Sequence, residues 1–127
     1  MRDYPPAKEL LEAIAAFLSE EVVGELEGRK RFFAIVATNL CHILARESEF
    51  GAAIAAEQCR DLWELLGREG VPPPGADHDD LALELSHELC RRIREGDADE
   101  GEMRAQVLEY LRTELRARLD INNPGFG

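Results

Sequence analysis

Apolar residues recur every three or four positions along most of the chain, the spacing that places them on one side of an α-helix. The pattern predicts five helices, at about residues 5–22, 29–49, 52–68, 81–95 and 101–119. No segment alternates with the two-residue period of a half-buried strand. We therefore expect an all-α fold, arranged as an antiparallel bundle of about five helices.

Glycine and proline separate the predicted helices. A glycine pair within 24–28 follows the first, Gly51 follows the second and Gly96 follows the fourth. Residues 67–80 hold three consecutive prolines, which cannot continue a helix, and form a predicted Pro/Gly-rich connector. The last residues, 120–127, contain a proline and two glycines and should form an irregular tail.

Length and charge limit the classes of protein to consider. A chain of 127 residues is the usual size of one domain, so we expect a single helical domain over 1–127. Its net charge of −11 repels phosphate backbones and anionic lipids, and we expect neither nucleic acid nor a membrane as partner. The apolar runs are too short to span a bilayer and the first residues do not resemble a signal peptide, which favours a cytoplasmic location.

The three cysteines, Cys41, Cys59 and Cys90, have no paired spacing. Zinc sites usually contain a C-x-x-C pair, and the nearest approach here is His87-x-x-Cys90. We therefore predict free thiols, no bound metal and no cofactor. Cys59 falls on the apolar side of its helix and should be buried.

Motifs of the common enzyme classes are missing from the sequence. It has no phosphate-binding glycine loop and no G-x-S-x-G nucleophile turn. The single Glu84-x-x-His87 lacks the second copy that a di-iron helical site requires. We therefore do not expect the chain to be an enzyme.

One polar row interrupts the apolar pattern of the second predicted helix. Asn39, His42 and Arg46 are spaced by three and four and so share one side of it. Such a row usually marks the solvated side of a helix. The alternative is a groove for a ligand or a partner group, with Arg46 as its anion-binding member. We expect His42 at the surface and Asn39 buried.

Basic residues cluster in two places, 29–31 and 91–94. In an acidic protein such clusters more often pair with nearby carboxylates than bind a partner. Glu88 lies at helical pairing distance from Arg91 and Arg92.

Four segments together, 6–12, 27–47, 89–96 and 119–124, resemble a bacterial family of helical domains of unknown function. Members of that family are encoded beside or fused to aminoglycoside-phosphotransferase-like kinases, often near acyl-CoA dehydrogenases. The resemblance covers nearly the whole chain. It departs at Gly125, where the family pattern has a basic residue.

The resemblance implies a non-catalytic accessory or interaction protein, a partner or regulator of a phosphotransferase-type kinase in acyl metabolism. Arg29, Arg31 and Asn123, which we expect to be exposed and outside the apolar stripes, are the candidate contacts. The alternative is a small-molecule-binding bundle with its site between the second and fourth predicted helices. A homo-oligomer is a further expectation.

Overall fold

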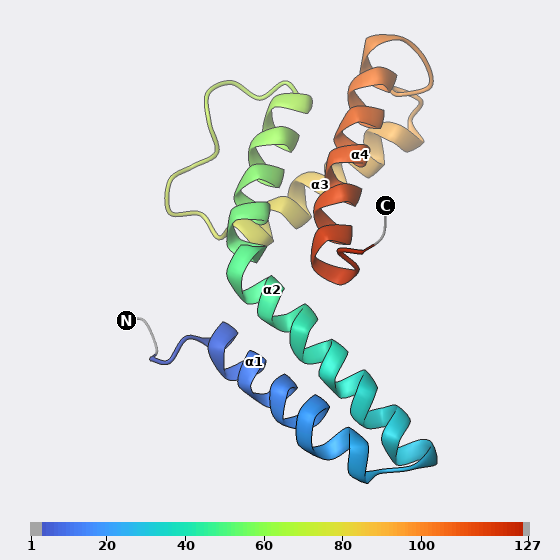
Figure 1. Cartoon of the computed structure of the whole chain (residues 1–127). Coiled ribbons are helices and arrows are strands. Elements are labelled where there is room, and N and C mark those ends of the chain that lie inside the picture. Colours follow the sequence, from blue (N-terminus) through green and yellow to red (C-terminus); the bar gives the residue numbers. More distant parts are fainter. Residues whose placement is uncertain (1–3, 126–127) are drawn as a thin grey trace. The chain divides into compact units, whose positions relative to one another are not determined.

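Helices make up most of residues 4–125, the part of the chain described by the computed structural model. The element order is α1 (Ala7–Phe17), the π-helical turn η1 (Leu18–Val22), the 3-10 turn η2 (Val23–Glu25), α2 (Gly28–Leu65), α3 (His78–Arg94) and α4 (Gly101–Asn122) (Figure 1). No strand occurs within these described residues. The all-α class is confirmed, but the structure has four α-helices and does not confirm the predicted five-helix antiparallel bundle.

The second and third predicted helices are one continuous helix, α2, so Gly51 does not end a helix. A glycine inside a helix costs only about 1 kcal/mol relative to alanine. Four of the five residues in the following segment, 52–56, are alanine, the residue with the highest helix propensity. Their preference for helix offsets the cost of the glycine.

Helix α3 ends where the sequence predicts, just before Gly96, whose φ is 94°. The N–H of Gly96 donates to the carbonyl of Ile93 and the N–H of Asp97 to that of Arg92, both at 3.1 Å. These are the two bonds of a Schellman motif, which needs a left-handed residue that glycine adopts without strain. Gly67, with φ of 75°, follows α2 in the same way.

Residues 66–77 join α2 to α3 without helix and overlap the predicted connector of 67–80. Helix α3 begins earlier than predicted because Asp77 caps it: its side-chain Oδ1 accepts the N–H of Asp80 at 3.1 Å. Helix α4 continues to Asn122 and so includes the first residues of the predicted irregular tail. Residues 126–127 of that tail lie outside the described part.

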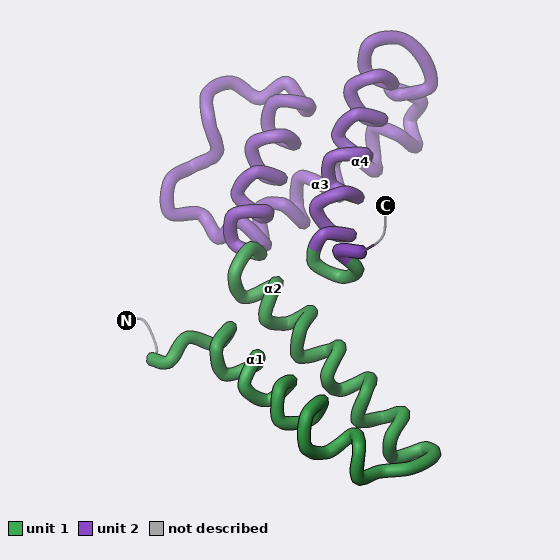
Figure 2. The backbone as a smooth tube through the Cα atoms, in the orientation of Figure 1, with its two compact units in different colours: residues 1–51, 121–123 green, residues 52–120, 124–127 purple. Residues whose placement is uncertain are grey.

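The chain divides into two compact units (Figure 2). Unit 1 contains Met1–Gly51 and Ile121–Asn123, and unit 2 contains Ala52–Asp120 and Pro124–Gly127. Helix α2 therefore contributes to both units, as does α4.

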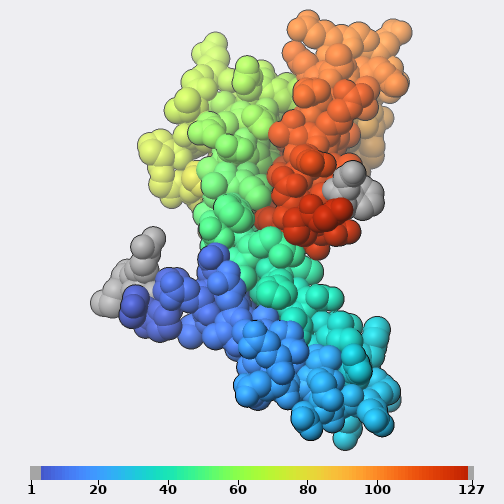
Figure 3. Space-filling view, in the orientation of Figure 1, coloured from blue at the N-terminus to red at the C-terminus, as the bar shows by residue number. Residues whose placement is uncertain are grey.

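Unit 1 is built on a helical hairpin of α1 and the first part of α2, which run antiparallel (Figure 1). An ion pair between Lys8 Nζ and Glu49 Oε2, at 3.8 Å, joins the open end of the hairpin. The packing between the two helices is close along the hairpin (Figure 3). The buried residues of these two helices in unit 1 are small: Ala15, Ala34, Thr38 and Ala45. Short side chains let the helices approach but leave the large apolar ones outside.

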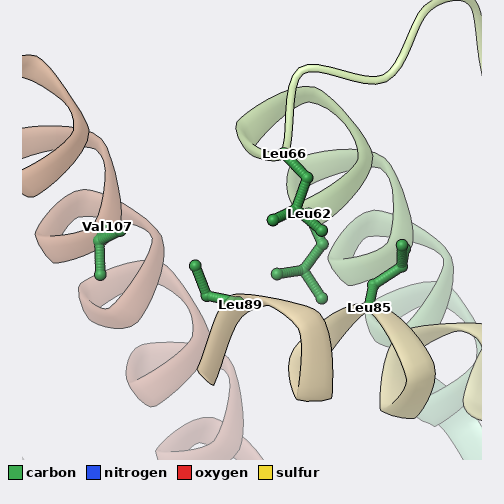
Figure 4. Close-up of a cluster of buried hydrophobic side chains, with 5 residues drawn as sticks. All are labelled: Leu62, Leu66, Leu85, Leu89 and Val107. Atoms are coloured by element: carbon green, nitrogen blue, oxygen red, sulfur yellow. The ribbon is translucent and has the colours of Figure 1, made fainter. Parts of the chain in front are cut away.

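Unit 2 has a core of larger side chains, contributed by the end of α2, by α3 and by α4 (Figure 4). Its buried cluster consists of Leu62, Leu66, Leu85, Leu89 and Val107. Leu62 and Leu85 are fully buried, so three helical segments share one hydrophobic centre.

Candidate functional site

The Arg46 side chain forms a hydrogen bond that stabilises the fold. Its Nε donates to the backbone carbonyl oxygen of Ile121 at 2.7 Å, within unit 1. Ile121 lies in the last turn of α4, where carbonyl groups have no partner within the helix. Arg46 therefore caps the end of α4.

Asn39 and His42 are both exposed, so the prediction for His42 is confirmed and that for Asn39 is wrong. We expected burial of Asn39 because apolar residues surround it on the helix. Leu40 beside it is itself 52% exposed, because the apolar side of α2 is left open in unit 1. Asn39, His42 and Arg46 all lie in unit 1, whereas α3, the fourth predicted helix, lies in unit 2.

The basic cluster of α3 forms the expected ion pairs. Glu88 Oε1 lies 3.9 Å from Arg91 and 3.5 Å from Arg92, and Arg91 also pairs with Glu95 at 3.1 Å. Glu88 Oε2 accepts a 2.7 Å hydrogen bond from Arg68, which holds the pKa of the Glu88 carboxyl below its ordinary value. Ion pairs within the fold therefore explain why basic residues are clustered on α3.

The other basic cluster differs. Arg29, Lys30 and Arg31 are all exposed, and none of them forms an ion pair with an acidic residue of the described chain. Phe32 and Phe33 follow, 61% and 51% exposed, with their ring centroids 5.7 Å apart. We call these five residues, 29–33, the basic tip.

Two features make the basic tip unusual. It occupies the first turn of α2, which contains no acidic residue, so three cations lie at the positive end of the helix dipole. Cations there destabilise a helix by roughly 0.3–1 kcal/mol each. The guanidinium of Arg29 also lies over the Phe33 ring, 5.2 Å from its centroid. Helix stability therefore does not account for these charges.

Asn123, the third predicted contact, is exposed and belongs to unit 1 with Ile121. No hydrogen bond of its side chain to another described residue accompanies it. Asn123 follows Ile121, whose carbonyl Arg46 caps, by two positions.

A cavity of about 300 Å³ opens in unit 2 between α2 and α4. Its lining residues are Asp61, Glu64, Leu65, Gln106, Glu109, Tyr110 and Thr113. The Tyr110 hydroxyl accepts a 3.0 Å hydrogen bond from the Gln58 amide, and burial raises the pKa of Tyr110. Burial, and then the charge of Glu57, raise the pKa of Asp61. Asp61, Glu64 and Glu109 make the cavity acidic, and Leu65 and the Tyr110 ring add apolar surface.

Cys59 is fully buried, as predicted, and its thiol donates to the carbonyl oxygen of His78 at 3.0 Å. Burial raises the pKa of this thiol and so disfavours the nucleophilic thiolate. Cys41 is half-buried and Cys90 is exposed. Within residues 4–125, no three His, Cys, Asp or Glu side chains are grouped so that they could hold a metal ion.

Comparison with known proteins identifies the family. The profile of a domain of unknown function, DUF6285, matches residues 24–126. This chain belongs to the DUF6285 family. No curated protein and no solved structure matched it. No helix of the described part of this DUF6285 protein is both long and apolar enough to cross a membrane.

The sequence pattern does not reveal one exposed apolar surface of the DUF6285 chain. Large apolar side chains remain half exposed along both helices of the hairpin in unit 1. Their three-and-four spacing is the ordinary signal of a buried stripe, so the sequence alone assigns them to a core. The available signal is a set of small residues at helical spacing, which indicates where the two helices meet: Ala15, Ala34, Thr38 and Ala45.

Proposed function

We propose that this chain is a non-catalytic accessory protein that binds a partner protein through its basic tip. The observation that carries the proposal is the exposure of Arg29, Lys30 and Arg31 without acidic partners in the described chain. A chain of net charge −11 has many carboxylates available, yet none of those within residues 4–125 pairs with these three cations. The tip is thus able to bind an acidic surface.

The composition of the tip suits a protein interface. Arginine and aromatic residues are enriched at the centres of such interfaces and among the side chains that contribute most to affinity. The stacking of Arg29 on Phe33 also restricts a long side chain before binding, which lowers the entropy lost on association.

For the partner we infer a phosphotransferase-type kinase of acyl metabolism, which the chain would regulate. Support for this identity comes from the gene company that the family resemblance implies. An acidic region on that kinase would complement the tip. The isolated chain is then expected to show no hydrolase, transferase or redox turnover.

Co-expression with the neighbouring kinase-like protein, followed by affinity capture, tests the proposal. The variant Arg29→Glu with Arg31→Glu should weaken the complex and reduce its salt dependence, because the reversed charges would no longer attract an acidic surface of the partner. The matched control is Arg94→Glu with Arg104→Glu, which makes the same change in net charge at exposed arginines elsewhere. Equal weakening in both variants, no complex with the wild-type chain, or turnover by the chain alone would contradict the proposal.

The cavity of unit 2 favours a second candidate function, the binding of a small molecule. Its volume of about 300 Å³ lies at the lower end of the range for ligand pockets. Its carboxylates and the Tyr110 ring suit an amphipathic cation. A co-purifying ligand found by mass spectrometry, lost in Tyr110→Ala and retained in the basic-tip variant, would support this function.

A further inference from the structure

A second surface of unit 1 adjoins the basic tip, because Phe33 of the tip lies on the same side of α2 as Leu40 and Leu44. Six large apolar side chains of the hairpin are between 49% and 55% exposed, and one of them, Phe33, belongs to the basic tip. The other five are Leu10, Ile14, Phe17, Leu40 and Leu44. The three on α1 are spaced by four and three, and the two on α2 by four, so each set forms a stripe along its helix. We call these five residues the apolar face.

Both stripes lie on the same side of the hairpin. On α1 the stripe is rotated by roughly 100–160° from the interhelical residue Ala15, at 100° per residue. On α2 the stripe is rotated by about the same angle, in the same sense, from Ala34 and Thr38. Because the helices are antiparallel, equal rotations bring the stripes to one side. Lys8 and Glu49 are rotated in the other sense, by roughly 20° and 60°, so their ion pair lies on the other flank of the line where the two helices meet.

The same ion pair sets the heights of the residues along the hairpin. Nine residues separate Lys8 from Phe17, and nine separate Glu49 from Leu40, so Phe17 and Leu40 lie at about the same level. Ile14 lies near the level of Leu44 by the same reasoning. The two stripes therefore match in height at these two levels, whereas Leu10 lies at the level of Glu47.

We propose that a second copy of this chain covers the apolar face. A two-fold axis parallel to the helices would place α1 of each copy against α2 of the other, with Phe17 on Leu40 and Ile14 on Leu44. Every neighbouring pair of helices is then antiparallel, as in an up-down-up-down four-helix bundle. The matched heights make the face complementary to itself, which a symmetric dimer requires.

The exposed area is sufficient for such a dimer. An aromatic side chain can bury about 150–250 Å² and an aliphatic one less, so a half-exposed residue leaves up to roughly 100 Å² and the five supply at most about 500 Å² per copy. A pair of copies would bury up to about 1,000 Å², where specific interfaces begin. A patch of this size is also among the largest that monomeric proteins expose.

Charge favours a second copy over a charged partner at this surface. None of the five residues is ionisable, so the net charge of −11 produces no like-charge contact at the centre of the interface. An acidic or basic partner would gain no ion pair with them. The apolar face thus differs in chemistry from the cations of the basic tip, and the two sets of residues can be substituted separately.

Light scattering after size exclusion, on the full chain at micromolar concentration, should give twice the mass of 14.2 kDa. Leu40→Glu should give a monomer that retains the helical circular dichroism of the wild-type chain. The control Ile35→Glu changes a 41% exposed residue on another side of α2 and should leave the dimer intact, as should the charge reversals at Arg29 and Arg31. A monomeric wild-type chain, or a Leu40→Glu variant that remains dimeric, would overturn the proposal.

Cross-linking tests the arrangement itself, in a background where Cys41, Cys59 and Cys90 are replaced by alanine. Phe17→Cys on one copy and Leu40→Cys on another, mixed and treated with a short bis-maleimide, should give a linked pair of unlike chains. Phe17→Cys alone should link poorly, because α1 does not meet α1 across the axis. Linkage of Phe17→Cys to itself at equal or higher yield would overturn the proposed arrangement.

Discussion

The Nε–H of Arg46 donates to the backbone carbonyl oxygen of Ile121 at 2.7 Å, joining residues 75 positions apart in the chain. Ile121 is only 2% exposed, so little water could replace this donor at the end of α4. The residue whose spacing indicated an anion-binding role instead holds the last turn of a helix within unit 1. Its charge is used for structure.

Arg46→Ala should lower the free energy of unfolding by about 1–2 kcal/mol, because the Ile121 carbonyl loses a charge-assisted hydrogen bond. Arg46→Lys should lose most of the same energy, since lysine lacks the planar Nε–H at that position. Urea unfolding followed by circular dichroism measures both. Asn39→Ala, an exposed change on the same side of α2, is the control and should fall within about 0.5 kcal/mol. A loss equally small for Arg46→Ala would show that the cap contributes little.

Helix positions could be predicted from the sequence because apolar spacing and the breakers at Gly96 and 72–74 act locally. The continuity of α2 could not, because a lone glycine signals a helix end only when the following backbone turns to positive φ. Gly96 does this, with φ of 94°, whereas Gly51 keeps helical geometry. Both positions are glycine, so the residue type alone does not distinguish a helix end from a position inside a helix.

Gly51→Ala should raise the free energy of unfolding by about 0.5 kcal/mol, because alanine loses less backbone entropy in a helix. A Cβ there would meet Glu47 Oε1 at 2.8 Å, the end of a flexible side chain that can move aside. Thermal unfolding checks the gain. A melting temperature below that of the wild-type chain would mean that Glu47 cannot move without a cost greater than the entropic gain.

The candidate site was harder to predict than the helices, because exposure depends on what covers a stripe. Leu40 and Leu62 both occupy apolar positions of α2, yet Leu40 is 52% exposed and Leu62 fully buried. The difference arises from α3 and α4, which supply a second and third layer to Leu62 in unit 2. Spacing within one helix carries no information about those layers.

The three thiols should react at different rates with an alkylating reagent. Cys90 is exposed and should be modified first, Cys41 more slowly, and Cys59 only on unfolding, because it is fully buried and burial raises its pKa. Timed alkylation with peptide mass spectrometry resolves the three sites. The control is the chain in denaturant, where all three should react alike. Modification of native Cys59 at the rate of Cys90 would show that its packing opens readily.

Asp61 should make stability depend on pH. Burial and, after it, Glu57 raise the pKa of its carboxyl in the folded chain, so the folded state favours the protonated form. The contribution of Asp61 to stability is then fully present below its unfolded value, near 3.8, and is lost as the pH rises through the raised folded value. Asp61→Asn removes that loss, because a neutral amide is not penalised at the cavity. The variant should therefore unfold at a higher urea concentration than the wild-type chain at neutral pH, and the difference should shrink steadily as the pH is lowered toward 3.8. A gain that is the same at every pH would come from an uncharged effect of the amide, such as a new hydrogen bond, and would contradict a raised pKa of Asp61.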